Sequence, residues 1–182
     1  MTTLWATSDL HFGHKQAVAG FGRPFKDADD MDEQLIERFN AVVGKTDVTY
    51  LLGDVSFLTP SQTRPLLDRL HGSIVLIFGN HDDKRMRKLS RWTAVRQTMS
   101  ILYDGYDLHM SHHPPMMSMI GSPGMRDLWL HGHLHSKTPG TLPMYDVGVD
   151  ANGWEPVRLD DIVAKARQRE QSLATLKNLI GG

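Results

Sequence analysis

Metal-ligating residue types recur at the ends of segments that this sequence predicts to be strands. In the clearest case, the apolar run Ile74 to Phe78 predicts a short buried strand from Ser73 to Phe78, which Gly79 breaks. The chain continues as Asn80-His81-Asp82-Asp83, so an amide, an imidazole and two carboxylates follow the strand directly. The carboxyl ends of strands in open α/β sheets border the crevice where ligands bind, which gives these polar residues functional weight.

Four other predicted strand ends carry the same residue types, and no cysteine is present to supply thiolate ligands. Loop residues that are merely solvated should vary among serine, lysine, glutamate and threonine, whereas these positions hold only aspartate, asparagine or histidine. The pattern therefore predicts a shared metal site built from nitrogen and oxygen ligands. Its seven candidate ligands are Asp9, His11, Asp54, Asn80, His112, His133 and His135.

The number of candidate ligands predicts two metal ions rather than one. A single ion takes roughly four to six ligands, so we expect two divalent ions that share one bridging carboxylate. Such ions lie about 3.5–4 Å apart and clamp the attacking and leaving oxygens of an in-line displacement at phosphorus. Ligands of this mix suit Mn, Fe, Co, Ni or Zn without choosing among them. The predicted activity is therefore the hydrolysis of a phosphoric ester.

Strands must bring these ligands together. The first is predicted from Thr2 to Thr7, and Asp9 and His11 follow it two residues apart, a spacing that in an extended chain points both side chains to one face. The turn Tyr103-Asp104-Gly105 predicts a hairpin between two later strands. The later strands are predicted at Val48–Leu52, Val95–Leu102, Tyr106–Met110, Leu128–Leu130 and Pro143–Val149.

Helices are predicted between and after these strands. One has Asp30 as its N-cap, with Glu33 completing a capping box. A second begins at Thr59-Pro60, where Pro65 is expected to lie in the first turn. A C-terminal helix is predicted from about Leu159. The loop Met116–Met125 could line a substrate wall, pack on the core or form a dimer contact.

The composition is that of an ordinary globular protein. At 182 residues the chain predicts a single catalytic domain over 1–182. Its 20 basic and 21 acidic residues give no overall attraction to polyanions. The sequence lacks an apolar run near the ~18 residues that span a bilayer. It also lacks the basic and then apolar start of a secretion signal, so we expect a cytoplasmic protein without membrane contact.

The candidate ligands stand in ordered motifs. The sequence resembles the signature of the calcineurin-like metallophosphoesterases at Asp9-x-His11, Gly53-Asp54, Gly79-Asn80-His81-Asp82, Ser111-His112 and Gly132-His133-x-His135. After these, Gly148-x-Asp150 looks like the closing segment of the family's small, single-domain bacterial or phage-type members. The resemblance implies a four-layer α/β/β/α sandwich of two mixed β-sheets with flanking helices. It also implies hydrolysis of phosphomonoester or phosphodiester bonds.

By the same resemblance, Asp54 would bridge the two metal ions. A hydroxide between the ions would attack phosphorus in line with the leaving alkoxide, and His81 would act as the general acid that protonates the leaving oxygen. Imidazole suits this role because it titrates near neutral pH. The implied ligands of the first ion are Asp9, His11, Asp54 and His135. Those of the second ion are Asp54, Asn80, His112 and His133.

The role of Asp82 and the choice between His112 and His113 as ligand each leave two possibilities. Asp82 either orients His81 through a hydrogen bond, as part of the catalytic machinery, or caps the helical segment that follows, for which Asp83 is the other candidate. Of the adjacent histidines after the predicted strand Tyr106–Met110, His112 is the expected ligand because of its position in the motif. His113 would then touch substrate.

Further substrate contacts are expected from His14 and Arg23, each of which could instead be solvated. The run Lys84, Arg85, Arg87, Lys88 and Arg91 either attracts phosphate-rich substrates, including nucleotides and nucleic-acid ends, or forms a solvated helix face. We therefore expect a small or nucleotide-type phosphorylated substrate, with the preference for monoester or diester and the oligomeric state both open. A non-catalytic scaffold of the same fold that binds another protein is the alternative from a different class.

Overall fold

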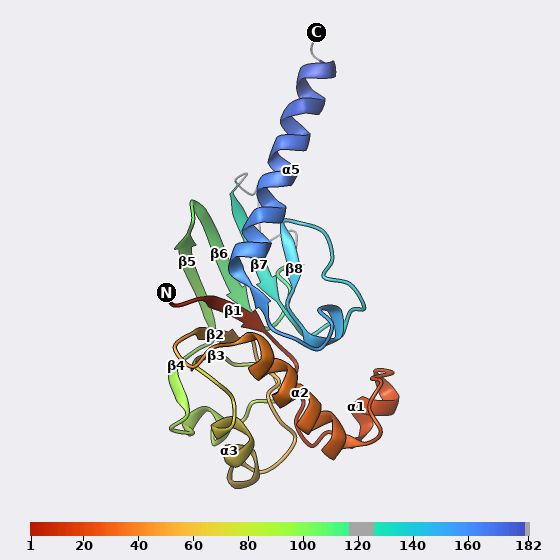
Figure 1. Cartoon of the computed structure of the whole chain (residues 1–182), viewed down its shortest axis with the longest axis vertical. Helices are drawn as coiled ribbons and strands as arrows, with labels where there is room; N and C mark the ends of the chain where they lie inside the picture. Colours follow the sequence, from red (N-terminus) through yellow and green to blue (C-terminus); the bar gives the residue numbers. More distant parts are fainter. Residues whose placement is uncertain (117–125, 181–182) are drawn as a thin grey trace.

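Two mixed β-sheets with flanking helices make up the protein, as the sequence predicts (Figure 1). The computed structural model describes residues 1–116 and 126–180. The Met116–Met125 loop thus lies outside the described residues except for Met116, which is exposed. Every helix in the described ranges is too short or too polar to cross a lipid bilayer.

The first sheet brings three strand ends to one edge. Strands β1 to β4 run parallel, and β9 pairs antiparallel with β1. Because Leu4 pairs with Val48, and Val48 with Ser73, the carboxyl ends of β1, β2 and β3 lie side by side. In spatial order the strands are β4 (Trp92–Arg96), β3 (Ser73–Ile77), β2 (Val48–Leu51), β1 (Leu4–Thr7) and β9 (Val157–Arg158).

The second sheet begins with the predicted hairpin. Its turn has positive φ at Asp104 (51°) and Gly105 (83°), which matches the right-handed twist of the two strands it joins. After the hairpin, β7 runs parallel to β6, and β8 runs parallel to β7. The carboxyl ends of these three strands therefore also share one edge. In spatial order the strands are β5 (Thr98–Tyr103), β6 (Tyr106–Ser111), β7 (Asp127–His131) and β8 (Met144–Asp146).

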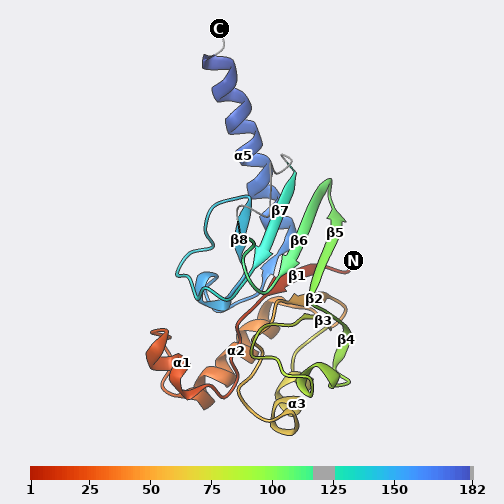
Figure 2. The ribbon, with the colours of Figure 1, turned by 180° about the vertical axis from the view of Figure 1, so that it is seen from behind.

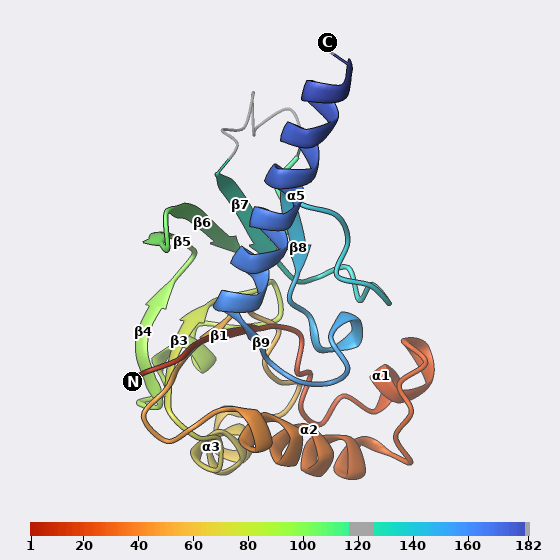
Figure 3. The ribbon, with the colours of Figure 1, turned by 45° about the horizontal axis from the view of Figure 1, so that its top comes forward.

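The helices cover the two sheets differently. In Figure 3, α2 and α3 lie on the face of the first sheet that points away from the second. Seen from behind in Figure 2, strands β5 to β8 stand in front of α5, which continues past the sheet. The helices are α1 (Lys15–Gly20), α2 (Ala28–Val42), α3 (Pro60–Asp68) and α5 (Leu159–Ile180).

The central strands are buried on both faces, which explains their continuous apolar runs. On β3, Ile74 and Leu76 pack into the core under α2 and α3, whereas Val75 and Ile77 pack into the core between the sheets. On the neighbouring strand, Leu51 again faces the first of these cores. The first sheet is therefore an inner layer, packed against helices on one face and against the second sheet on the other.

The predicted strand Val95–Leu102 is wrong as a single element. The chain pairs with β3 through Arg96, leaves the first sheet at Gln97 and enters the second sheet at Thr98. Both sheets accept an extended, partly apolar segment, so the residue pattern continues across the crossing. Only the hydrogen-bond partners of the two halves separate them.

Helix α2 begins earlier than predicted. Asp27, not Asp30, is the N-cap: its backbone is extended (φ −158°, ψ −176°) and its side chain accepts the N–H of Asp30. Glu33 instead pairs with Arg69. Several neighbouring aspartates satisfy the sequence rule for a cap, and the backbone conformation decides which of them serves.

Pro65 does not lie in the first turn of its helix, where the sequence predicts it. Helix α3 starts at Pro60 with a capping box between Thr59 and Gln62, which puts Pro65 beyond the first turn. A proline there leaves the carbonyl four residues earlier without its helical donor. That carbonyl belongs to Ser61, which is exposed, so water can satisfy it.

Helix α5 packs through its first turns only, among the residues whose side chains are described. Ile162 is fully buried, whereas Leu173 is 40% exposed. We expect Ile162→Ala to lower the free energy of unfolding by about 2–5 kcal/mol, because it leaves a cavity between the sheets and the helix. The matched change Leu173→Ala should cost less than about 0.5 kcal/mol in the same urea titration. An equal loss in both variants would contradict this packing.

Candidate metal centre

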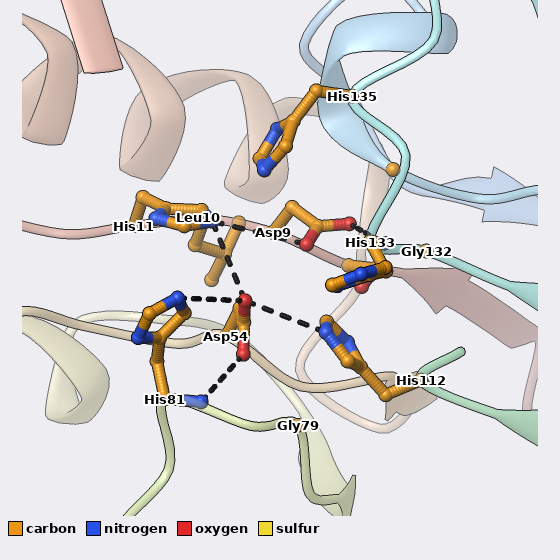
Figure 4. A network of polar contacts seen from close by, with 12 residues as sticks. Asp9, Leu10, His11, Asp54, Gly79, His81, His112, Gly132, His133 and His135 are labelled. Carbon is orange, nitrogen blue, oxygen red and sulfur yellow. Dashed lines mark hydrogen bonds and ion pairs between the residues drawn. The ribbon is translucent and has the colours of Figure 1, made fainter.

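Six of the seven candidate ligands come together in Figure 4, where the carboxyl ends of strands from both sheets meet, and the seventh, Asn80, contacts His112. Asp54, in the loop after β2, lies at the centre. Its Oδ2 is 3.4 Å from Nε2 of His112, 3.7 Å from Nε2 of His11 and 3.9 Å from Nε2 of His81. Loops after β1, β3 and β6 thus converge on a single carboxylate oxygen from the loop after β2.

Three overlapping groups of side chains have ligand atoms within 4.8 Å of one another. Asp9 occurs in two of them and His112 in two, so the groups form one continuous cluster rather than separate sites. Asn80 joins it through Oδ1, which is 3.0 Å from Nε2 of His112. The groups are Asp9, His11 and His135; Asp9, Asp54 and His112; and His112, His113 and His133.

The buried atoms of this cluster fit a metal ion. Oδ1 of Asp9 and Nε2 of His11 lie 3.8 Å apart, and neither has a hydrogen-bond partner among the described residues. A buried polar atom left in this way costs about 1–3 kcal/mol. A cation between the two atoms would remove that cost for both. The nitrogen and oxygen donors are of the kind that divalent transition metals accept.

Outer hydrogen bonds aim the imidazoles at the centre. Nδ1 of His112 contacts the carbonyl oxygen of Leu52 at 2.7 Å, so Nδ1 carries the proton and the lone pair of Nε2 faces inward. Nδ1 of His135 contacts Oδ2 of Asp150 at 2.9 Å with the same result. Partners of this kind fix the tautomer and the orientation of metal-ligating histidines.

Electrostatics favours an ionised Asp54 carboxylate and neutral rings at His11 and His133. Burial opposes the charge of Asp54, but the hydrogen bond and positive charge of His112 outweigh it and lower the pKa of Asp54 to about 2. Burial lowers the pKa of His11 and, with repulsion from His113, that of His133. Burial opposes the charge of His112, but its hydrogen bond with Asp54 and the negative charges of Asp9 and Asp54 outweigh burial and raise the pKa of His112. The states of Asp54, His11 and His133 are those that metal binding requires, whereas His112 would release a proton when an ion binds.

The backbone at the ligands differs from the prediction. Asp9 and His11 do not share a face through an extended chain, because both have left-handed backbone, with φ of 61° and 54°. Asp54, His133 and His135 also have positive φ. Such residues cost about 1–3 kcal/mol each and concentrate at functional sites, where the surrounding structure holds them. The ligands are therefore aimed by strained turns and not by strand periodicity.

Arg23 was expected to touch substrate, and the structure contradicts this. Its guanidinium is buried, with Nη2 donating to Oδ2 of Asp150 at 2.7 Å and to the carbonyl oxygen of Asp9. Nη1 donates to the carbonyl oxygen of Leu10. No local sequence pattern indicates this pairing, since Arg23 and Asp150 are 127 positions apart. Arg23 instead holds the left-handed turn that carries Asp9 and the carboxylate that orients His135.

Asp82 has neither of the two contacts expected of it. Its buried carboxylate accepts three backbone N–H groups, from Gly79, Asp54 and Val55. It thereby ties the loop after β2 to the loop after β3. The capping role belongs to Asp83, whose Oδ1 accepts the N–H groups of Arg85 and Met86 at the 3-10 turn Met86–Lys88.

Two further histidines, His14 and His113, border the cluster. Nδ1 of His14 is 3.1 Å from Nδ1 of His11, and the His14 ring stacks on Phe57 at 3.8 Å between centroids. Burial, aided by charge repulsion from His11, lowers the pKa of His14 to about 4, which keeps the ring neutral and lets its Nδ1 accept a hydrogen bond from Nδ1–H of His11. The exposed His113 lies 4.3 Å from the ring of His133, which makes it a further candidate ligand.

His81 stands at the open side of the cluster. Its backbone N–H donates to Oδ1 of Asp54, while its imidazole is 47% exposed and tilts against Phe57. A ring in this position can exchange protons with water and still reach the atoms bound near Asp54.

The family model of the calcineurin-like phosphoesterases matches residues 2–172, and the chain belongs to this family. The resemblance carried by the five motifs is thereby confirmed. Members of this family typically bind divalent metals.

Relatives of similar length occur in archaea and phages. An uncharacterized protein of Methanocaldococcus jannaschii is 30% identical over 98% of this chain and 99% of its own. The gene 66 protein of Mycobacterium phage D29 is 31% identical over 95% of this chain and 100% of its own. Among solved structures, a protein of unknown function from Aquifex aeolicus has a TM-score of 0.74 at 21% identity, covering 90% of this chain and 99% of that one.

The buried pair of Arg23 and Asp150 generates a stability prediction. We expect Arg23→Met to lower the free energy of unfolding by about 3–5 kcal/mol, because it leaves the Asp150 carboxylate buried without its cation. The matched change Arg64→Met removes an exposed pair with Asp68 and should cost less than about 1 kcal/mol. Urea titration at neutral pH measures both. A stable Arg23→Met protein with impaired substrate binding would restore the substrate role.

Proposed function

We propose that the protein hydrolyses phosphomonoesters or phosphodiesters, of small or nucleotide-type substrates, with two divalent metal ions. One observation carries the proposal: ligand-type atoms from both sheets converge on Asp54, while Oδ1 of Asp9 and Nε2 of His11 stay buried without a partner among the described residues. Membership of the calcineurin-like phosphoesterase family supports it. A phosphoesterase from E. coli has the same fold, with a TM-score of 0.52 at 15% identity over 82% of this chain and 80% of that one.

The cluster divides naturally between two ions. Asp54 would be shared, because its Oδ2 lies near His11 on one side and His112 on the other. When bound, two such ions supply a water nucleophile of lowered pKa and positive charge for the phosphoryl oxygens. The first ion would be held by Asp9, His11, Asp54 and His135. The second would be held by Asp54, Asn80, His112 and His133, with His113 close by.

His81 would serve as the general acid. Its imidazole lies near Asp54 but is half-exposed, so it can donate a proton to the leaving oxygen and recover one from water. Phe57, stacked against His14 and tilted against His81, restricts the rings of both residues. Asp82 acts on this step only through the backbone, because it fixes the loop from which His81 projects.

A metal-reconstitution assay tests the proposal. Protein stripped of metal by a chelator is supplied separately with Mn, Fe, Co, Ni or Zn and given p-nitrophenyl phosphate or bis(p-nitrophenyl) phosphate. We expect turnover that depends on the added ion. If neither ester is hydrolysed with any of the ions, the proposal fails and the non-catalytic scaffold is favoured.

The role of His81 makes a separate prediction. We expect His81→Ala to lower kcat by roughly 10²–10³-fold, because the leaving oxygen loses its proton donor. Metal content, measured by plasma mass spectrometry, should not change. His109→Ala is the matched control, since His109 lies on the second sheet beside Trp129 and away from the cluster. Unchanged kcat in His81→Ala would exclude the general-acid role.

Asp54→Asn tests the role of a metal ligand, as distinct from that of the general acid His81. The amide keeps the shape of the carboxylate but removes the charge shared between the two ions, so both metal content and kcat should fall. A variant that retains two ions at full occupancy would contradict the bridging role.

A further inference from the structure

The basic residues that follow the metal cluster in sequence differ in whether the protein already binds their charged groups. They are Lys84, Arg85, Arg87, Lys88 and Arg91. Arg91 donates to the carbonyl oxygens of Leu67, Leu70 and Gly72, which places it under the end of α3. Arg85 is 78% exposed and pairs with Asp83. Both guanidinium groups are therefore already occupied by the protein. Lys84 and Lys88 are exposed.

The guanidinium of Arg87 is held in place but uses only part of its hydrogen-bonding capacity. Its Nε donates to the carbonyl oxygen of Asp82 at 2.7 Å, and its guanidinium lies 3.5 Å from the ring centroid of Phe78. Neither Nη group has a hydrogen-bond partner among the described residues. A guanidinium fixed by Nε and by stacking, with its two Nη groups free, loses little side-chain entropy when it binds an anion.

Arg87 lines a hollow beside the metal cluster. The hollow has a volume of about 380 Å³ and shares Asn80, His112 and His113 with the cluster. Gln97, Thr98 and Ser111 add neutral polar side chains to its wall. Cavities of this size hold a nucleotide-sized group.

A second hollow lies on the other side of the cluster. It has a volume of about 280 Å³ and is lined by His81, Phe57 and Arg85, among others. Figure 4 shows His81 and His112 reaching Asp54 from opposite sides. A phosphorus atom held near Asp54 would therefore have one hollow for each of two ester groups, with the proton donor on the side of the smaller one.

From this arrangement we propose that the substrate is a phosphodiester whose second arm lies in the hollow beside His112, where Arg87 binds a phosphate on that arm. The inference rests on the proposed function and adds to it the substrate class and a specificity-determining residue. A guanidinium with two free Nη groups matches the paired oxygens of a phosphate, which the neutral wall of the hollow does not repel.

The reaction balances as a hydrolysis. The phosphorus–oxygen bond on the side of His81 breaks, and the leaving oxygen takes a proton from His81. A new bond forms between phosphorus and a water oxygen, and His81 recovers a proton from water. The products are an alcohol in the hollow beside His81 and a phosphomonoester whose remaining arm stays in the hollow beside His112.

A pair of chromogenic diesters tests this assignment. One is the p-nitrophenyl ester of thymidine 5′-phosphate, and the other differs only by a further phosphate on the 3′-oxygen. We expect kcat/KM for the second ester to exceed that for the first by about tenfold or more, mainly through KM, because Arg87 gains a charged partner. A ratio near one in the unmodified protein would overturn the proposal.

The ratio of kcat/KM for the two esters also shows whether Arg87 binds the phosphate or only supports its loop. Arg87→Met keeps an unbranched side chain on Phe78 and should reduce the ratio to about one, since no guanidinium remains. Lys88→Met removes the same charge from the same run without touching the hollow, and should keep the ratio. If Arg87→Met lowers kcat/KM for both esters equally, Arg87 only supports its loop and the proposal is wrong.

Calorimetry supplies a readout that does not need turnover. Thymidine 3′,5′-bisphosphate should bind about tenfold tighter than thymidine 5′-monophosphate, and Arg87→Met should abolish the difference. If neither diester is hydrolysed but this preference is found, the proposed activity fails and the phosphate subsite stands. Equal affinities of the two nucleotides for the unmodified protein would exclude the subsite.

Discussion

The buried carboxylate of Asp54 is the constraint on which the rest of the structure depends. Its Oδ1 accepts the N–H of His81 and its Oδ2 faces imidazoles from both sheets. A charge in such a position is stable only when donors or cations surround it, because water is excluded and the local dielectric constant is low. Loops that follow separate strands must therefore converge on one side chain.

This convergence brings segments closer than ordinary side chains allow. A Cβ on Gly79 would collide with Oδ1 of Asp54, and one on Gly132 would collide with the side chains of Ser8 and Asp9. Glycine at these two positions is required by the close approach itself. The left-handed backbone of five candidate ligands adds strain that the surrounding contacts must offset.

Those surrounding contacts connect stability with function. Asp82 binds three backbone N–H groups across two loops, and the buried pair of Arg23 and Asp150 holds the turn after β1 to the ring of His135. Each contact lies outside the cluster but fixes the direction of an atom within it. Two hollows reach the cluster, one on the side of His81 and the other beside His112 and His113. Hydrogen bonds thus orient the candidate ligands, while the side of the cluster at His81 is accessible to solvent.

The sequence by itself determined which residues gather at the site and the kind of fold that gathers them. Ligand chemistry is a property of residue type, and strands buried on both faces are recognisable from their apolar runs. Tertiary structure alone decided the partners of Arg23, Asp82 and Asp150, the left-handed turns at Asp9 and His11, and the passage of the chain between sheets. The reason is that a local pattern reflects neighbours along the chain, whereas these features depend on groups up to 127 positions away that meet only in the folded protein.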